Sequence, residues 1–201
     1  MIKTIIFDLG KVIVPFELKR GLEAIQRHSR LSAEEIGKRL TADGIVARFE
    51  IGGMAPRQFV SSMTELLEMP VDYDTFCAAW CSIFLPDTLI PEEMIAALRR
   101  RYRTLLLSNT NAIHYQMLER SYPVLGLFDA AVLSHEVGAA KPSPAIYEAA
   151  LAKAGCRPEE CFYTDDIEEY VAAARRHGID AVVFQSAGQV ERELRARGVT
   201  W

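Results

Sequence analysis

Polar side chains suited to chemistry follow the apolar, strand-like segments of this chain. Asp8 closes the first such segment, the pair Asp165-Asp166 closes another, and Ser108-Asn109 ends a third. Lys141 stands before a proline that opens a predicted helix. Because ligands of parallel α/β sheets collect beyond the carboxyl ends of the strands, we expect these side chains to meet at one edge of a sheet.

Such a meeting would favour metal-assisted phosphoryl transfer. Three carboxylates in one place repel one another unless a hard divalent cation neutralises them, and oxygen ligands without nearby His or Cys favour Mg²⁺. The hydroxyl of Ser108, the amide of Asn109 and the ammonium of Lys141 would then hold the oxygens of a phosphoryl group. Singly, each residue is more often a turn, cap or solvated residue. Their ordered occurrence at successive strand ends favours the chemical interpretation.

Five short apolar segments predict the strands that would position these residues. They are residues 2–7, 104–107, 130–133, 161–164 and 181–184. Helical periods lie around residues 94–98, 146–155 and 171–178, and the last two end at glycines, which suit a left-handed helix stop. This alternation predicts an α/β fold, a Rossmann-like three-layer sandwich whose parallel five-stranded sheet is covered on both faces.

The region from about residue 16 to residue 85 interrupts the alternation, because it offers only helical patterns. One apolar stripe runs from Leu18 to Ile25, a capping box at residues 32–35 opens a second helix, and residues 59–67 and 73–84 predict two more. We therefore predict a helical-bundle cap at residues 16–85, inserted into a core domain of residues 1–15 and 86–201. The joints are expected near residues 14–17 and 84–91.

Composition limits the class of partner. With 23 basic and 27 acidic side chains the net charge is -4, which argues against a nucleic-acid partner. No run approaches the roughly 20 apolar residues of a membrane span, and Lys3 and Asp8 interrupt any signal peptide, so we expect no membrane partner and a cytoplasmic location. The four cysteines lack zinc-site spacing and are expected to be reduced thiols. We expect a monomer or weak homodimer.

The order of the motifs resembles that of the haloacid dehalogenase superfamily, a large group of mostly phosphatases, along nearly the whole chain. Residues 7–12 (Phe-Asp-Leu-Gly-Lys-Val) are similar to its first motif, 107–110 (Leu-Ser-Asn-Thr) to its second, 141–142 to its third and 164–166 to its fourth. The helical insertion matches the alpha-helical C1-type cap that follows the first motif in many members. The resemblance implies a Mg²⁺-dependent phosphatase acting on a small phosphorylated metabolite.

Carried over position by position, the resemblance implies catalytic roles. Asp8 would be the nucleophile that forms an aspartyl-phosphate, Ser108 would bind a phosphoryl oxygen together with Asn109, and Lys141 would balance the charge of nucleophile and phosphate. The metal ligands that it implies are Asp8, the carbonyl of Gly10, Asp166 and, directly or in support, Asp165.

Gly10 departs from the family pattern, because phosphatases of the family usually carry there a second Asp that protonates the leaving alcohol. Losing such a group typically costs about 10²- to 10⁴-fold in rate, so good leaving groups are favoured. A subset with Asp-Leu-Gly and Ser-Asn-Thr-Asn motifs includes bacterial sugar-phosphate phosphatases acting on substrates such as alpha-D-glucose 1-phosphate, and this chain resembles that subset. An anomeric oxygen leaves more readily than an ordinary alkoxide. A positive φ at Gly10 is a further expectation.

Two alternatives remain open at this point. A 2-haloacid dehalogenase also lacks the Asp at the position of Gly10, but it holds no Mg²⁺ and keeps no adjacent acidic pair like Asp165-Asp166. A non-catalytic member that binds a phosphorylated ligand or a protein partner is the second. Within the cap, Glu50 is a candidate for substrate contact and for supplying the missing proton, whereas Trp80 is as easily part of the cap's own core.

Overall fold

The computed structural model describes residues 1–42 and 44–201. Its sheet has five parallel strands in the order β3-β2-β1-β4-β5. The strands are β1 (Thr4–Phe7), β2 (Arg103–Ser108), β3 (Ala130–Leu133), β4 (Cys161–Asp165) and β5 (Asp180–Val183). The predicted α/β fold is therefore confirmed, and each predicted strand lies within two residues of its observed position.

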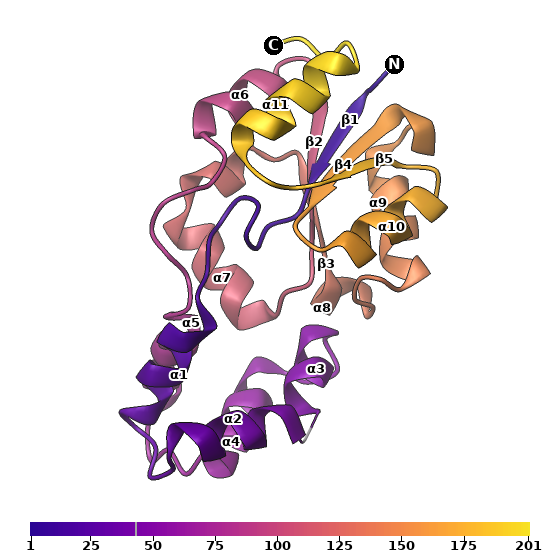
Figure 1. Cartoon of the computed structure of the whole chain (residues 1–201). Helices are drawn as coiled ribbons and strands as arrows, with labels where there is room; N and C mark the ends of the chain where they lie inside the picture. The colour runs from indigo at the N-terminus through magenta and orange to yellow at the C-terminus, as the bar shows by residue number, and fades with distance from the viewer. Residues whose placement is uncertain (43) are drawn as a thin grey trace.

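The two faces of the sheet bury alternate residues of each strand, as the period of two requires. In β1, Ile5 and Phe7 join one core cluster while Ile6 joins the other. The first cluster is covered by α6 (Glu92–Arg99), α7 (Ala112–Ser121) and α11 (Ala187–Ala196), and the second by α9 (Pro144–Ala154) and α10 (Glu168–Arg176). Helices thus flank both sides of the sheet, which gives the three predicted layers (Figure 1).

Helix ends follow the capping chemistry of the sequence. The side chain of Asn111 accepts a hydrogen bond from the backbone N–H of His114 at the start of α7. Helix α9 ends at Gly155 in the left-handed conformation, and Gly178, just beyond α10, has φ 81°, so both predicted glycine stops are confirmed. Short helical segments complete the core: α8 (Ser134–Val137), η1 (Pro123–Leu127) and η2 (Pro158–Glu160).

The inserted region folds as a group of helices with its own apolar core. The helices are α1 (Leu18–Gln26), α2 (Ala33–Ala42), α3 (Ile45–Glu50), α4 (Pro56–Leu66) and α5 (Tyr73–Cys81). Phe49 stacks on Phe59 with ring centroids 4.0 Å apart, and Phe76 meets Phe59 edge-on. At the start of α2, Ser32 and Glu35 exchange the hydrogen bonds of the expected capping box. Figure 1 shows these helices beyond the end of the sheet at which the strands finish.

The cap is connected to the core by two adjacent segments. Phe16 and Phe84 form an antiparallel bridge, the N–H of Glu17 donates to the carbonyl of Ile83 at 2.8 Å, and the N–H of Leu85 donates to the carbonyl of Pro15 at 3.0 Å. The predicted joints therefore lie side by side. The extents of the two domains, as residue ranges, remain a prediction.

Four helices were not predicted. The cap contains α3 in addition to the four expected helices, because its six residues are too few to show a period. The four residues of α8 are fewer still, while α7 and α11 bury few apolar residues. None of the helices in the described part of the chain is long and apolar enough to cross a membrane.

Candidate active site

The sheet order places three carboxylates together. Strands β1 and β4 are neighbours, Phe7 is in register with Thr164, and the N–H of Asp8 donates to the carbonyl of Thr164 at 2.9 Å. Asp8 therefore leaves β1 beside Asp165 and Asp166. Ligand oxygens of these three residues lie within 4.8 Å of one another.

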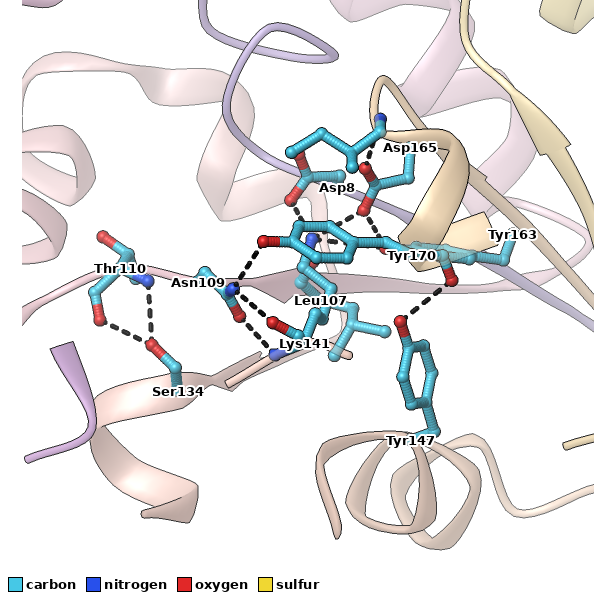
Figure 2. Close-up of polar contacts among 11 residues, drawn as sticks. Asp8, Leu107, Asn109, Thr110, Ser134, Lys141, Tyr147, Tyr163, Asp165 and Tyr170 are labelled. Atoms are coloured by element: carbon cyan, nitrogen blue, oxygen red, sulfur yellow. Dashed lines mark hydrogen bonds and ion pairs between the residues drawn. The ribbon is translucent and has the colours of Figure 1, made fainter. Parts of the chain in front are cut away.

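Lys141 supplies the positive charge at this site. Its ammonium donates to Oδ1 of Asp8 at 2.6 Å and to Oδ2 of Asp165 at 2.7 Å, and it contacts the carbonyl of Leu107 at 3.1 Å (Figure 2). The side chain is only 2% exposed. A buried ammonium is stable only when such partners replace its hydration, so this residue must be held in place.

The side chain of Asn109 holds the main chain of Lys141. Its Oδ1 accepts from the N–H of Lys141 at 2.7 Å, and its Nδ2 donates to the carbonyl of Lys141 at 3.0 Å. Lys141 lies in the loop between α8 and α9, three residues before the helix that it was expected to open directly. The predicted substrate ligand Asn109 thus has a positioning contact that sequence reasoning missed.

Tyr163 is a further member of the site that was not predicted. It is fully buried in β4, its hydroxyl donates to Oδ2 of Asp165, and the ammonium of Lys141 lies 3.2 Å from its oxygen. Residues two apart on a strand share one face, so the spacing of Tyr163 and Asp165 could have revealed it. The ring of Tyr170 lies 5.1 Å from the same ammonium, close to Asn109 (Figure 2).

The acidic pair divides into an oriented and an unpartnered residue. Asp165 uses both oxygens within the protein, since Oδ1 accepts from the N–H of Ile167 at 2.8 Å while Oδ2 binds Lys141 and Tyr163. The carboxylate of Asp166 accepts no hydrogen bond from any other residue among 1–42 and 44–201. Its oxygens are therefore free for an external cation.

The electrostatics of the cluster favour that cation. Burial raises the pKa of Asp8 to about 7, with repulsion from Asp165 adding to the shift and Lys141 opposing it. Burial and the neighbouring Asp165 also raise the pKa of Asp166. The two carboxylates beside Lys141 raise its pKa in spite of burial. Three carboxylates thus face the ammonium of Lys141, while that of Lys11 acts on Asp166, and an oxygen-only donor set with excess negative charge fits Mg²⁺.

A cavity of about 450 Å³ opens from this edge of the sheet into the cap. Leu9, Gly10 and Ser108 line its core end, and the cap contributes Glu50 and Trp80, both of which the sequence indicated as candidates. Burial raises the pKa of Glu50. Trp80 also stacks on Phe76 and belongs equally to the core of the cap.

Gly10 is constrained by packing and not by a left-handed backbone. Positive φ occurs at the next residue, Lys11 (φ 56°), whereas Gly10 is not among the glycines with positive φ, so that expectation was wrong. A Cβ at position 10 would lie 2.9 Å from Cε1 of Phe16. The ring of Phe16 fills the space in which a side chain would stand.

Ser134 joins the site to the cap. Its hydroxyl donates to the carbonyl of Glu50 at 2.6 Å and accepts from the N–H of Thr110 at 2.9 Å. The end of α3 is therefore tied to the loop that follows β2. The sequence contains no signal for this contact.

Comparison with known proteins agrees with this fold and identifies the family. The sequence pattern of the haloacid dehalogenase-like hydrolases matches residues 2–178, and the chain belongs to this family. A D-ribitol-5-phosphate phosphatase of Bacteroides thetaiotaomicron is 24% identical over 200 residues, covering 96% of this chain and 97% of the relative. A phosphatase of Mycobacterium tuberculosis is 28% identical over 218 residues, covering 98% and 95%.

A solved structure of the same family is also similar. It is an enzyme from Bacteroides thetaiotaomicron in complex with magnesium and inorganic phosphate, with a TM-score of 0.83 and 29% identity, covering 92% of this chain and 96% of the other. Both of the relatives described above are named as phosphatases. The chain is therefore a family hydrolase of the phosphatase type.

Proposed function

We propose that this protein is a Mg²⁺-dependent phosphatase that hydrolyses a small phosphorylated metabolite through an aspartyl-phosphate on Asp8. The observation that carries the proposal is the buried ammonium of Lys141, which binds Asp8 and Asp165 at once beside the unpartnered carboxylate of Asp166. This arrangement holds a nucleophilic carboxylate within a donor set for a hard cation. The similar structure with magnesium and inorganic phosphate supports the assignment.

In the proposed reaction a carboxylate oxygen of Asp8 attacks phosphorus, the bond from phosphorus to the organic oxygen breaks, and that oxygen takes up a proton. Water then attacks the phosphorus of the aspartyl-phosphate, loses a proton, and restores the carboxylate as inorganic phosphate departs. Lys141 offsets the charge of nucleophile and phosphate, and Ser108, at the core end of the cavity, donates to a phosphoryl oxygen.

Mg²⁺ would be held by Asp8, Asp166 and the carbonyl of Gly10, with Asp165 in a supporting role because its oxygens already bind Lys141, Tyr163 and Ile167. When bound, the ion neutralises the phosphate dianion as it approaches three carboxylates. In the absence of an Asp at position 10, Glu50 of the cap is the candidate proton donor, since it lines the same cavity and its pKa is raised by burial.

The two alternatives receive less support from the site. A dehalogenase needs no cation, yet Asp166 adds an unpartnered, repelled carboxylate beside Asp165. A purely binding protein needs no nucleophile, yet the carboxylate of Asp8 is oriented by Lys141, and the residues that follow it, Leu9 and Gly10, line the cavity. The relatives named as phosphatases support the catalytic interpretation.

The test is phosphate release from a panel of phosphorylated metabolites, with and without Mg²⁺, by the unmodified protein and by Asp8→Asn. We expect Mg²⁺-dependent release that the substitution reduces at least about 10³-fold, because it removes the nucleophile and preserves its size. Chloride release from 2-chloropropionate would instead identify a dehalogenase. Release by neither route, with binding of phosphate esters retained, would identify a binding protein.

The finer predictions concern the substrate and the cellular setting. A sugar phosphate is supported by the resemblance and by the relative named as a D-ribitol-5-phosphate phosphatase. A cytoplasmic location, a monomer or weak homodimer, and a cap spanning residues 16–85 also remain predictions.

A further inference from the structure

The cavity above the candidate site continues far into the cap. Besides Gly10 and Ser108 at its core end, it reaches α1, α2 and α3. Its apolar lining comprises Leu9, Phe16, Leu18, Leu22, Ile25, Leu40, Val46, Trp80, Ile83, Phe84 and Leu118. A volume of about 450 Å³ leaves room for an organic group well beyond the phosphoryl position.

Three polar side chains of the same wall, those of His114, Thr41 and Asn109, are already engaged with the protein. His114 accepts at Nδ1 from the amide of Asn111, and its Nε2 lies 3.1 Å from the carbonyl of Trp80. The neutral ring therefore carries its proton on Nε2 and donates it to that carbonyl. The hydroxyl of Thr41 donates to carbonyls of its own helix at 3.1 Å. The amide of Asn109 is bound to the main chain of Lys141.

Apart from Ser108, which is assigned to the phosphoryl group, the side chains left for the hydroxyls of a sugar are Thr110, Glu50 and Lys19. The indole N–H of Trp80 is also without a partner among the described residues, but it is buried. The side chain of Lys19 is 85% exposed, and its ammonium lies 3.7 Å from the carboxylate of Glu23. Glu50 is the candidate proton donor. Burying hydroxyls without replacing their hydrogen bonds to water is costly, so a polyol gains little from this lining, whereas an alkyl or aryl group gains from every apolar contact.

We infer that the cap cavity selects phosphomonoesters whose organic group is apolar. This inference rests on the proposed function and names its substrate class: the phosphoryl group lies at Asp8, Ser108 and Lys141, and an alkyl or aryl chain extends between α1, α2 and α3. A sugar phosphate is the competing occupant.

The experiment is a chain-length series of primary alkyl phosphates from methyl to hexyl, together with D-ribitol 5-phosphate, assayed with Mg²⁺. The alkyl leaving groups have nearly equal pKa values, so differences among them report contacts with the cavity. We expect kcat/KM to rise about fourfold for each methylene that enters the cavity, and hexyl phosphate to exceed ribitol 5-phosphate. A flat or falling series, or a preference for ribitol 5-phosphate, overturns the inference and leaves the proposed function standing.

A binding measurement keeps the two proposals separable. If no ester is hydrolysed, the proposed function fails, and calorimetry with Asp8→Asn and the methyl and hexyl phosphonates still tests the cavity. Tighter binding of hexylphosphonate by at least about tenfold supports the apolar chain site, and equal binding overturns it.

Substitution locates the effect in the cavity. Leu22→Asn introduces a polar group of similar size into the lining, and we expect it to lower the ratio of hexyl to methyl kcat/KM by at least fivefold. Leu89→Asn is the matched control, because Leu89 is 41% exposed and does not line the cavity. An unchanged ratio in folded Leu22→Asn, or an equal fall in both variants, contradicts the inference.

Discussion

At the scale of single residues, the acidic pair of β4 shows two adjacent side chains with separate tasks. Asp165 is bound on both oxygens by Lys141, Tyr163 and Ile167, so it organises the protein side of the site. Asp166 is bound by none of the described side chains, and burial together with repulsion from Asp165 raises its pKa, although Lys11 and Lys141 oppose the shift. A carboxylate in such a position destabilises the metal-free protein and gains its stabilisation from a cation.

We therefore expect Asp166→Asn to act in opposite directions on stability and on metal binding. Removing the repelled charge should leave the metal-free Tm equal to or higher than that of the unmodified protein, while the Mg²⁺ concentration for half-maximal activity rises at least about tenfold. Thermal unfolding without metal and a Mg²⁺ titration of activity measure the two effects. Unchanged Mg²⁺ dependence would mean that the metal is bound elsewhere.

Gly10 permits a second prediction at this scale. Gly10→Asp places a carboxyl where the family's general acid usually stands, but its Cβ would press on Cε1 of Phe16. The double substitution Gly10→Asp/Phe16→Leu removes the obstructing ring. If proton donation limits the rate, we expect the double variant to gain about tenfold or more on alkyl phosphates and little on phenyl phosphate.

Rates on both esters in Phe16→Leu alone give the baseline for that comparison. An equal gain on alkyl and phenyl phosphates would show that the change acts on binding and not on protonation of the leaving group. No gain in a folded double variant would show that another group, with Glu50 as the candidate, already supplies the proton.

At the scale of elements, α3 decides how the cap meets the core. The carbonyl of its last residue, Glu50, accepts from Ser134 of α8, and two residues later Gly52 turns with φ 73° against the backbone of His135. Only a residue without a Cβ fits there, because a Cβ would overlap the carbonyl oxygen of His135. The turn that follows α3 is thus packed directly against the backbone of α8.

We expect Gly52→Ala to displace α3 from α8 and to lower kcat/KM, because Glu50 moves with the helix. Gly44→Ala is the matched control: Gly44 also has a positive φ (64°), but open space surrounds its Cβ position. The control should lose about 1 kcal/mol in unfolding free energy from backbone strain alone. Equal losses of stability and activity in the two variants would show that the contact with His135 is unimportant.

At the scale of the whole molecule, one histidine lies between the two domains. His114 belongs to α7 of the core. Its ring nitrogen Nδ1 lies 3.1 Å from the side-chain amide of Asn111, and the ring stacks on Trp80 of the cap with ring centroids 5.4 Å apart. Burial lowers its pKa to about 4. The contact between cap and core is therefore made by the neutral ring, and acid conditions that favour the protonated ring destabilise the folded protein.

The sign of the pH dependence follows from that pKa. Above pH 6.5 the ring is neutral in the folded and unfolded chains; between pH 6.5 and pH 4 only the unfolded chain takes up the proton, so acidification favours unfolding. We expect the loss between pH 7 and pH 5 to be smaller in His114→Phe than in the unmodified protein by about 2 kcal/mol. Urea unfolding of both proteins at the two pH values measures the difference. Other groups with shifted pKa values, such as Glu50, contribute equally to both proteins, so their contributions cancel. Equal losses in both proteins would contradict the lowered pKa.

The sequence by itself determined the sheet and the identity of the charged groups. Strands such as β1 and β3 could be predicted because short apolar runs between turn residues have few other stable placements in a parallel sheet. The glycine helix ends and the capping box could also be predicted, because each depends only on residues within a few positions of one another in the sequence. The meeting of Asp8 with Asp165 and Asp166 followed from strand ends that share one edge.

Only the tertiary structure decided how those groups are connected. The bond from Asn109 to the main chain of Lys141 spans 32 residues, and that from Ser134 to Glu50 spans 84, so no periodicity encodes them. The constraint at Gly10 arises from the ring of Phe16, which reaches it from the segment leading into the cap. The lining of the cavity depends on side chains from α1, α2 and α3 facing the strand ends, and such long-range packing is decided only when the whole chain folds.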